Sequence, residues 1–277
     1  MSTGTSTSGA QSVAVQIKSL YKHRRLVLEM SKRELTDKYV GQALGWTWSI
    51  LHPIVLMGVY VFVFAVVFKQ RIGGTDDFPL DYTAYVLTGL VCWLNMQDSM
   101  SRTTASVVSK SELVKQVVFP IEILPIKAVL ASLFSMGVTL AVLVTYVLVR
   151  FGLSPWTLVL GPLAIALQMV FLTGIGFLLG SIAVFVRDIK DVVQIFSFAG
   201  VYIIPAFYLP SWTPPGFAPF LALNPFSHLI WCFQDAFFYG RIEHPVSWCV
   251  TLIMSLGAFF LGHRLFVKLS SLFGNFL

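Results

Sequence analysis

Six runs of apolar residues, each long enough to cross a lipid bilayer, constrain the fold of this chain more than any other feature. They lie at about 46–68, 82–102, 124–149, 156–186, 192–209 and 245–267, and a membrane-spanning helix needs about 20 such residues. Only 12% of the residues are charged, against roughly 25% in soluble domains. Lipid offers no hydrogen-bond partners to the backbone, so we expect an all-α membrane protein with six transmembrane helices.

The placement of Lys and Arg predicts how these helices are oriented. Seven Lys and Arg residues lie between position 13 and the first run, and others lie between runs two and three and between runs four and five. Positive loops stay on the cytoplasmic side of a membrane. We therefore expect a multi-pass membrane protein with both termini cytoplasmic. The net charge of +6 follows from this topology and calls for no nucleic acid.

The chain before the first run divides into two parts. Residues 1–12 are polar and predict a disordered tail. Residues 13–45 carry apolar and basic residues on opposite sides of a helical period, which predicts a cytoplasmic amphipathic interface helix. A simple membrane anchor is the alternative. Residues 46–277 then form the six-span transmembrane domain.

A second unusual segment lies between runs two and three. Ser109 and Glu112 have the spacing of a capping box, and Pro120 ends any helix that starts there. We expect a short helix over 110–119, forming a compact cytoplasmic projection. A solvated linker helix is the alternative reading.

A third unusual segment, 210–245, follows run five on the external side. Its prolines divide it into pieces too short to cross the membrane. Asn224 and Pro225 are typical of a helix start, and Gly240 is typical of a helix end. We expect two short re-entrant helices between spans five and six.

Motifs of enzyme and cofactor chemistry are missing from the sequence. There is no GxxxxGK[ST] and no Gly-Lys pair, so we expect no nucleotide site, and the five His and three Cys residues have no metal-ligand spacing. We therefore expect no catalytic residues, no metal and no cofactor. Asp235, Glu243, His228 and His244 gather in the external segment, which keeps a membrane-embedded glycosyl- or acyltransferase open as an alternative.

Two sets of residues in the spans are candidates for a substrate pathway. Asp98 and Arg102 are spaced for an ion pair in span two, and ionisable groups at membrane depth face a protein interior or water. They either line a pathway or sit at the inner interface. Aromatic rings, which stack on sugars but also serve as packing, recur on helical faces at Tyr60, Phe64, Phe68, Tyr85, Trp93, Phe198 and Tyr202.

Four motifs, in this order, resemble the membrane subunit of ABC-2 type exporters. They are RELTDKYVGQALGWTWSILHP at 33–53, LVKQVVFPIEILP at 113–125, VFVRDIKDVVQI at 184–195 and LNPFSHLI at 223–230. Within that family the chain is most similar to permeases that export polysaccharides such as O-antigen, capsule or teichoic acid.

The resemblance implies a mechanism that the composition does not. Such permeases form a homodimer that binds two copies of a cytosolic ATPase subunit, giving a two-plus-two complex in which the ATPase binds the ATP and Mg. The substrate implied is a lipid-linked glycan. Residues implied to contact the ATPase are Lys110, Glu112, Val114, Val117, Val118, Phe119, Arg187 and Asp188. Export of a small hydrophobic molecule or drug, and a proton-coupled secondary transporter, are the alternatives.

Overall fold

The computed structural model describes residues 24–37, 40–67, 79–116, 120–209, 212–214 and 216–277, and within these ranges every regular element is a helix. The longer ones are α2 (Arg24–Asp37), α3 (Trp48–Val61), α4 (Tyr82–Ser106), α6 (Ile123–Arg150), α7 (Thr157–Phe185), α8 (Ile189–Gly200), α10 (Pro225–Gln234) and α11 (Pro245–Ser270). The shorter ones are η1 (Gly45–Thr47), η3 (Val108–Lys110), α5 (Ser111–Gln116), α9 (Ala218–Leu223), α12 (Phe273–Phe276) and the π-helices η2 (Phe62–Val67) and η5 (Asp235–Tyr239).

Four helical segments are long and apolar enough to cross a bilayer: Gly45–Val67, Ile123–Arg150, Thr157–Phe185 and Pro245–Ser270. They coincide with the first, third, fourth and sixth predicted runs. The expectation of an all-α membrane protein is thereby confirmed for the described residues. The count of six spans stays a prediction, because α4 carries a polar face and α8 has only 12 residues, which is about 18 Å of helix.

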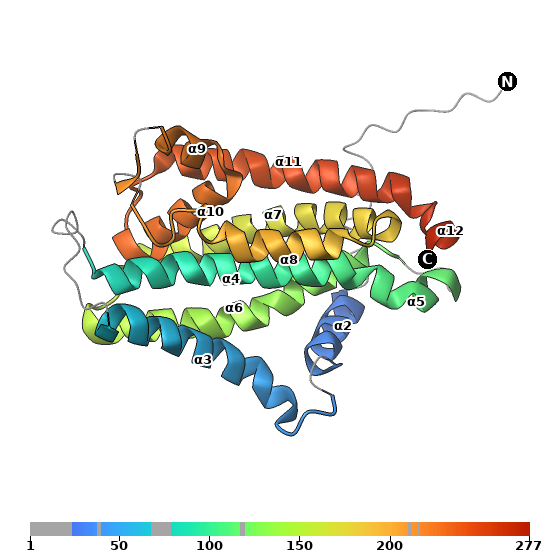
Figure 1. Ribbon diagram of the computed structural model, residues 1–277, viewed down its shortest axis with the longest axis horizontal. Coiled ribbons are helices and arrows are strands. Elements are labelled where there is room, and N and C mark those ends of the chain that lie inside the picture. The colour runs from blue at the N-terminus through green and yellow to red at the C-terminus, as the bar shows by residue number, and fades with distance from the viewer. Residues whose placement is uncertain (1–23, 38–39, 68–78, 117–119, 210–211, 215) are drawn as a thin grey trace.

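Helix α4 lies at the centre of the bundle, with α6, α7, α8 and α10 packed around it (Figure 1). Most of its residues are buried, including the polar side chains of Thr88, Asn95, Ser99 and Thr103. A helix enclosed by protein does not need the uniformly apolar surface that lipid requires. This explains why the second predicted run is less apolar than the others, and why its helix continues beyond residue 102 to Ser106.

The contact between α7 and α11 is the most extensive between any two described helices. At its centre, a Cβ added to Gly262 would lie 2.2 Å from the carbonyl oxygen of Gly174, and one added to Gly174 would lie 2.3 Å from the backbone of Ala258. Gly176, part of the GFLLG motif, instead lies against Thr103 of α4. Small residues thus let both neighbours of α7 approach it at backbone distance.

The fifth predicted span, 192–209, is not one continuous helix. Helix α8 begins earlier, at Ile189, and ends at Gly200, and turns and bends follow to 209. Two features account for the early end. Gly200 lies against the Trp93 ring, where an added Cβ would be 2.4 Å away, and Pro205 cannot donate the backbone hydrogen bond that a continuing helix requires.

The short helices expected between 210 and 245 are present as α9, α10 and η5. The side chain of Asn224 accepts a hydrogen bond from the backbone N–H of Phe226, with Pro225 at the first helical position. Gly240 ends η5 in the left-handed conformation, with φ of 59°. The predicted start and end signals of this segment are confirmed, while its external location stays a prediction.

The expected helix over 110–119 differs in its start. Residues Val108–Lys110 form a 3-10 turn and α5 begins at Ser111, so Ser109 is not the N-cap residue. The Ser109 hydroxyl instead donates to the carbonyl of Ser106, 3.5 Å away. The predicted capping box is therefore wrong at Ser109, because a bond back to α4 competes with the cap. Residues 117–119 lie outside the described residues.

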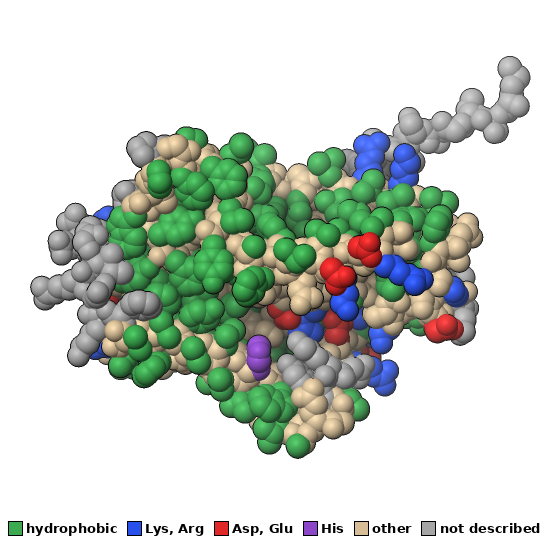
Figure 2. All heavy atoms as spheres, viewed as in Figure 1, with side chains coloured by type: hydrophobic (Ala, Val, Ile, Leu, Met, Phe, Trp, Pro, Cys, Tyr) green, Lys and Arg blue, Asp and Glu red, His purple; other side chains and the backbone are tan. Residues whose placement is uncertain are grey.

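The elements divide between two ends of the bundle. Helices α2, α5 and α12 and the turn between α7 and α8 lie at one end, and α9 and α10 lie at the other (Figure 1). Charged side chains gather over the first end, whereas most of the rest of the visible face is hydrophobic (Figure 2). We call the first end the charged end. It carries the described parts of the three segments that the sequence predicted to face the cytoplasm.

The α7–α11 contact predicts the outcome of a matched pair of substitutions on α11. Gly262→Ala should lower the unfolding free energy by about 1–3 kcal/mol, because the added methyl group meets the backbone of α7. Gly257→Ala is the control, since an added Cβ there has nothing within 4 Å. Thermal unfolding in detergent compares the two variants. Equal midpoints would contradict the packing described here.

Candidate functional site

A cavity of about 670 Å³ lies between α3, α4, α6 and α8. Five of the pathway candidates line it: Tyr60, Trp93, Asp98, Phe198 and Tyr202. Four of them lie on α3, α4 and α8, and Tyr202 lies in the turn after α8; Tyr60 and Tyr202 are 142 positions apart in the sequence. The structure therefore brings most of the described candidates together at one site.

The aromatic residues of the cavity differ in their exposure. Tyr60 is half-buried, and Phe198 and Tyr202 are exposed, Phe198 by 74%. Trp93 is only 1% exposed. Its indole nitrogen donates to the carbonyl of Ser197 at 3.2 Å, and its ring packs against Gly200. Trp93 thus forms part of the wall, while Tyr60, Phe198 and Tyr202 offer ring surface.

The other aromatic candidates do not line the cavity. Phe64 stacks on Phe207, with ring centroids 5.9 Å apart and planes 22° apart. Tyr85 is buried, and its hydroxyl donates to the carbonyls of Pro205 and Tyr208. Both residues pack the irregular segment after α8 against the bundle. Phe68 lies outside the described residues.

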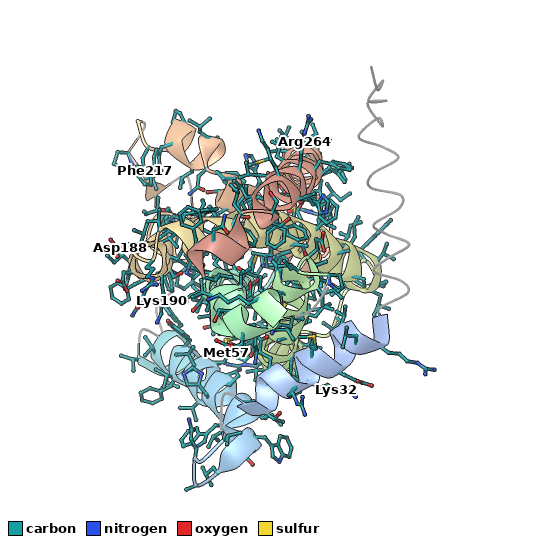
Figure 3. All side chains as sticks on the ribbon, turned by 90° about the vertical axis from the view of Figure 1, so that its right-hand side faces the viewer. Lys32, Met57, Asp188, Lys190, Phe217 and Arg264 are labelled. Carbon is teal, nitrogen blue, oxygen red and sulfur yellow. The ribbon has the colours of Figure 1, made fainter. Side chains whose placement is uncertain are left out.

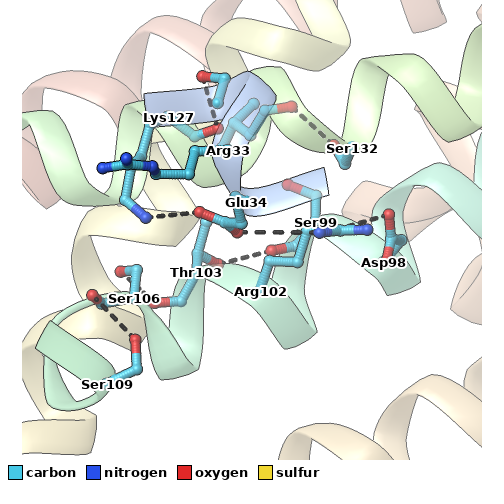
Figure 4. A network of polar contacts seen from close by, with 12 residues as sticks. Arg33, Glu34, Asp98, Ser99, Arg102, Thr103, Ser106, Ser109, Lys127 and Ser132 are labelled. Carbon is cyan, nitrogen blue, oxygen red and sulfur yellow. Dashed lines mark hydrogen bonds and ion pairs between the residues drawn. The ribbon is translucent and has the colours of Figure 1, made fainter. Parts of the chain in front are cut away.

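Asp98 connects the cavity to a network of charged side chains (Figure 4). Its carboxylate accepts from the Arg102 Nε at 2.8 Å, so the predicted ion pair is confirmed. Arg102 also lies 3.8 Å from the carboxylate of Glu34, and that carboxylate accepts from the Lys127 Nζ at 2.5 Å. The network therefore runs from α6, through Glu34 of α2, to Asp98 at the cavity.

The network lies within the protein rather than on its surface. The Lys127 side chain is 3% exposed and that of Arg102 is 9% exposed. A charge taken out of water is costly unless it is paired, so each cation depends on a carboxylate. The Ser31 hydroxyl adds a second link between α2 and α6, donating to the carbonyl of Lys127 at 3.1 Å.

Sequence reasoning missed Glu34 and Lys127 as members of this site. Lys127 carried a signal, because it is a lone cation one turn inside a long apolar helix, where ionisable groups have partners. Glu34 carried none beyond its place on an amphipathic helix. The pairing joins residues 93 positions apart, which no local spacing rule connects.

The residues expected to contact an ATPase lie at the charged end where they are described. Lys110, Glu112, Arg187 and Asp188 are exposed. Viewed from that end, Asp188 and Lys190 lie next to each other at the start of α8 (Figure 3).

Of the apolar residues expected to contact an ATPase, only Val114 lies among the described residues. Val114 is half-buried and packs against a cluster of the chain's own core that contains Val107, Leu124 and Phe177. Val117, Val118 and Phe119 lie outside the described residues. Contact of any of these residues with an ATPase stays a prediction.

The polar residues of the segment 210–245 form separate hydrogen-bonded groups rather than one cluster. The Asp235 carboxylate is fully buried and accepts from the His244 Nδ1 at 2.7 Å, the His244 backbone N–H and the Trp248 indole. Separately, Glu243 pairs with Arg241. The His228 Nε2 donates to the carbonyl of Ala222. The bonds of Asp235 join η5 to the start of α11.

Among the described residues, no group of three or more His, Cys, Asp or Glu side chains could hold a metal ion. The polar side chains of the cavity include Asn95, Asp98, Lys190 and Ser197, which come from α4 and α8 and line its wall.

The four long apolar helices among the described residues define a multi-pass membrane protein. The family described as ABC-2 type transporter matches residues 25–238, which is most of the chain. The chain therefore belongs to the ABC-2 type transporter family and is a transport subunit. The family resemblance predicted from the four sequence motifs is confirmed.

Several named relatives are similar over most of their length. The chain is 28% identical over 228 residues to an O-antigen export system permease protein RfbA of Myxococcus xanthus, covering 82% of this chain and 85% of the relative. It is also 24% identical over 222 residues to two proteins of the same name from Klebsiella pneumoniae, covering 79% of this chain and 82% of each relative.

The charged network predicts that Glu34 holds α2 against the bundle. Glu34→Gln removes the carboxylate that pairs with buried Lys127 and should release α2, because an unpaired buried charge costs about 3–5 kcal/mol. The matched control is Glu29→Gln on the same helix, where the side chain is exposed.

The readout is maleimide labelling of Val27→Cys, a buried position on α2, in a Cys249→Ser background that removes the exposed native thiol. Labelling should accelerate at least tenfold with Glu34→Gln, the equivalent of about 1.4 kcal/mol, and stay unchanged with Glu29→Gln. Slow labelling in both variants would show that Glu34 does not hold the helix.

Proposed function

We propose that this chain is the membrane subunit of an ABC exporter that moves a lipid-linked polysaccharide across the inner membrane. A separate cytosolic ATPase subunit binds the ATP and Mg, and two copies of each subunit form the complex. Both termini are cytoplasmic, on the same side as the charged end. The observation that carries the choice of a glycan is the similarity, over about four fifths of the chain, to permeases named for O-antigen export.

The cavity supports this substrate by its chemistry. Tyr60, Phe198 and Tyr202 offer aromatic surface, and the apolar faces of sugar rings stack on such surface. Asp98 and Lys190 supply polar groups at the same site. These charged side chains would not favour binding of a small hydrophobic molecule, whereas a hydrated glycan can lie beside them.

The position of the exposed charges supports an ATPase at the charged end. Glu34 links α2 to α4 and α6, and Asp98 links the same network to the cavity. A displacement of α2 by a cytosolic partner would therefore move groups that touch the cavity wall. The exposed turn with Arg187 and Asp188 leads directly into α8, another wall of the cavity.

Reconstitution tests the proposed function. Vesicles containing this chain and its ATPase subunit should translocate a lipid-linked polysaccharide only when ATP and Mg are present, and the chain alone should not hydrolyse ATP, because it has no P-loop. An ATPase subunit lacking its P-loop lysine is the control. Movement of a small hydrophobic molecule without movement of the glycan would reject the proposal in favour of the alternative substrate.

A matched aromatic pair on neighbouring turns tests the role of the cavity. Tyr60→Ala should lower the export rate roughly fivefold, because it removes ring stacking of about 1 kcal/mol from the cavity. Phe64→Ala removes a ring that also packs near Phe207 but does not line the cavity. It should lower stability without a selective loss of export. The measurement is the export rate divided by the ATPase rate; an equal ratio in both variants would assign Tyr60 to packing.

A further inference from the structure

Asn95 is a buried amide whose hydrogen-bonding capacity is unused. It is 2% exposed, lies on α4 and lines the cavity. Neither its amide nitrogen nor its amide oxygen has a hydrogen-bond partner among the described residues. A buried amide left unpaired costs about 1–3 kcal/mol. The side chain therefore presents both a donor and an acceptor that no described residue satisfies.

Ser197 presents a second unused group in the same cavity, from α8. It is 3% exposed, and its hydroxyl has no partner among the described residues. Its backbone carbonyl accepts from the indole of Trp93 on α4. This bond ties α8 to α4 beside the cavity, and these are the two helices that carry the unpaired side chains.

The chemistry of these two side chains limits the class of ligand that could form hydrogen bonds with them. Both side chains are neutral, and both can donate and accept, as a sugar hydroxyl can. An apolar molecule would leave them unpaired, and a site that hydrogen-bonds a hydroxyl discriminates strongly against a ligand that lacks it. The exposed rings of Phe198 and Tyr202 line the same cavity.

We propose that Asn95 and Ser197 form a subsite that hydrogen-bonds the hydroxyl groups of a sugar ring as the glycan occupies the cavity. The subsite rests on the proposed function, since it presumes a glycan substrate. It adds to the aromatic surface a specific requirement for hydroxyl groups, supplied by one protomer from two different helices.

Two serines provide a matched comparison. Ser197→Ala removes a hydroxyl in the cavity, and Ser99→Ala removes one that is equally buried and unpaired among the described residues but does not line the cavity. In the reconstituted complex, Ser197→Ala and Asn95→Leu should each raise the KM for the lipid-linked polysaccharide about threefold to tenfold. Ser99→Ala should leave the KM at the wild-type value. A wild-type KM for Ser197→Ala would overturn the subsite.

A labelling experiment tests occupancy without relying on transport rate or on the folding of Asn95→Leu. Ser197→Cys in a Cys249→Ser background should react with maleimide through the cavity, and the lipid-linked polysaccharide should slow that reaction at least threefold. The same polyprenyl carrier without sugar should not slow it. Ser99→Cys, at a buried position that does not line this cavity, should react slowly in all conditions. Equal protection by the sugar-free carrier would overturn the assignment to sugar hydroxyls.

The two levels of proposal fail in different ways. If the wild-type complex moves no glycan, the proposed function fails, and with it the basis for a sugar subsite. If the wild-type complex moves the glycan but the Ser197 variants behave as the Ser99 variants do, the function stands and only the subsite is rejected.

Discussion

The burial of most of α4 within protein is the constraint on which the rest of the structure depends. This helix carries Asn95, Ser99, Thr103 and the Asp98–Arg102 ion pair, a set of side chains that lipid would not accept. Helices α6, α7, α8 and α10 therefore have to surround it. The small residues of α7 and the short helices after residue 217 are needed to achieve this enclosure, and the cavity exists where α3 and α8 close it only in part.

Local features of the fold could be predicted from the sequence because their causes are local. The apolar runs predict the long helices, and Asn224, Pro225 and Gly240 determine the bounds of one helical segment by their own backbone chemistry. Two predictions failed where a contact with another element decided the outcome. Helix α8 ends at Gly200 against Trp93, and the Ser109 hydroxyl bonds to Ser106 instead of capping α5.

The candidate site could be predicted only in part for the same reason. The spacing of Asp98 and Arg102 was sufficient to predict their pair, since both lie on one helix. The period of a helix shows that Tyr60, Tyr85 and Trp93 lie on particular faces, but which face meets a cavity depends on neighbours that are distant in sequence. Tyr85 and Trp93 therefore proved to be packed, while Tyr60 offers its ring to the cavity. Glu34 and Lys127 were missed because their pairing depends wholly on the fold.

The glycine contact between α7 and α11 limits how the protein can change shape. With Gly262 and Gly174 at backbone distance, neither helix can rotate about its axis without driving a side chain into the other. The pair must move as one rigid body. Any change in the width of the cavity then falls to its own walls, α3, α4, α6 and α8, which lie outside that pair. Distances between α7 and α11 would stay constant through a transport cycle and provide a fixed frame against which the motion of the other helices can be measured.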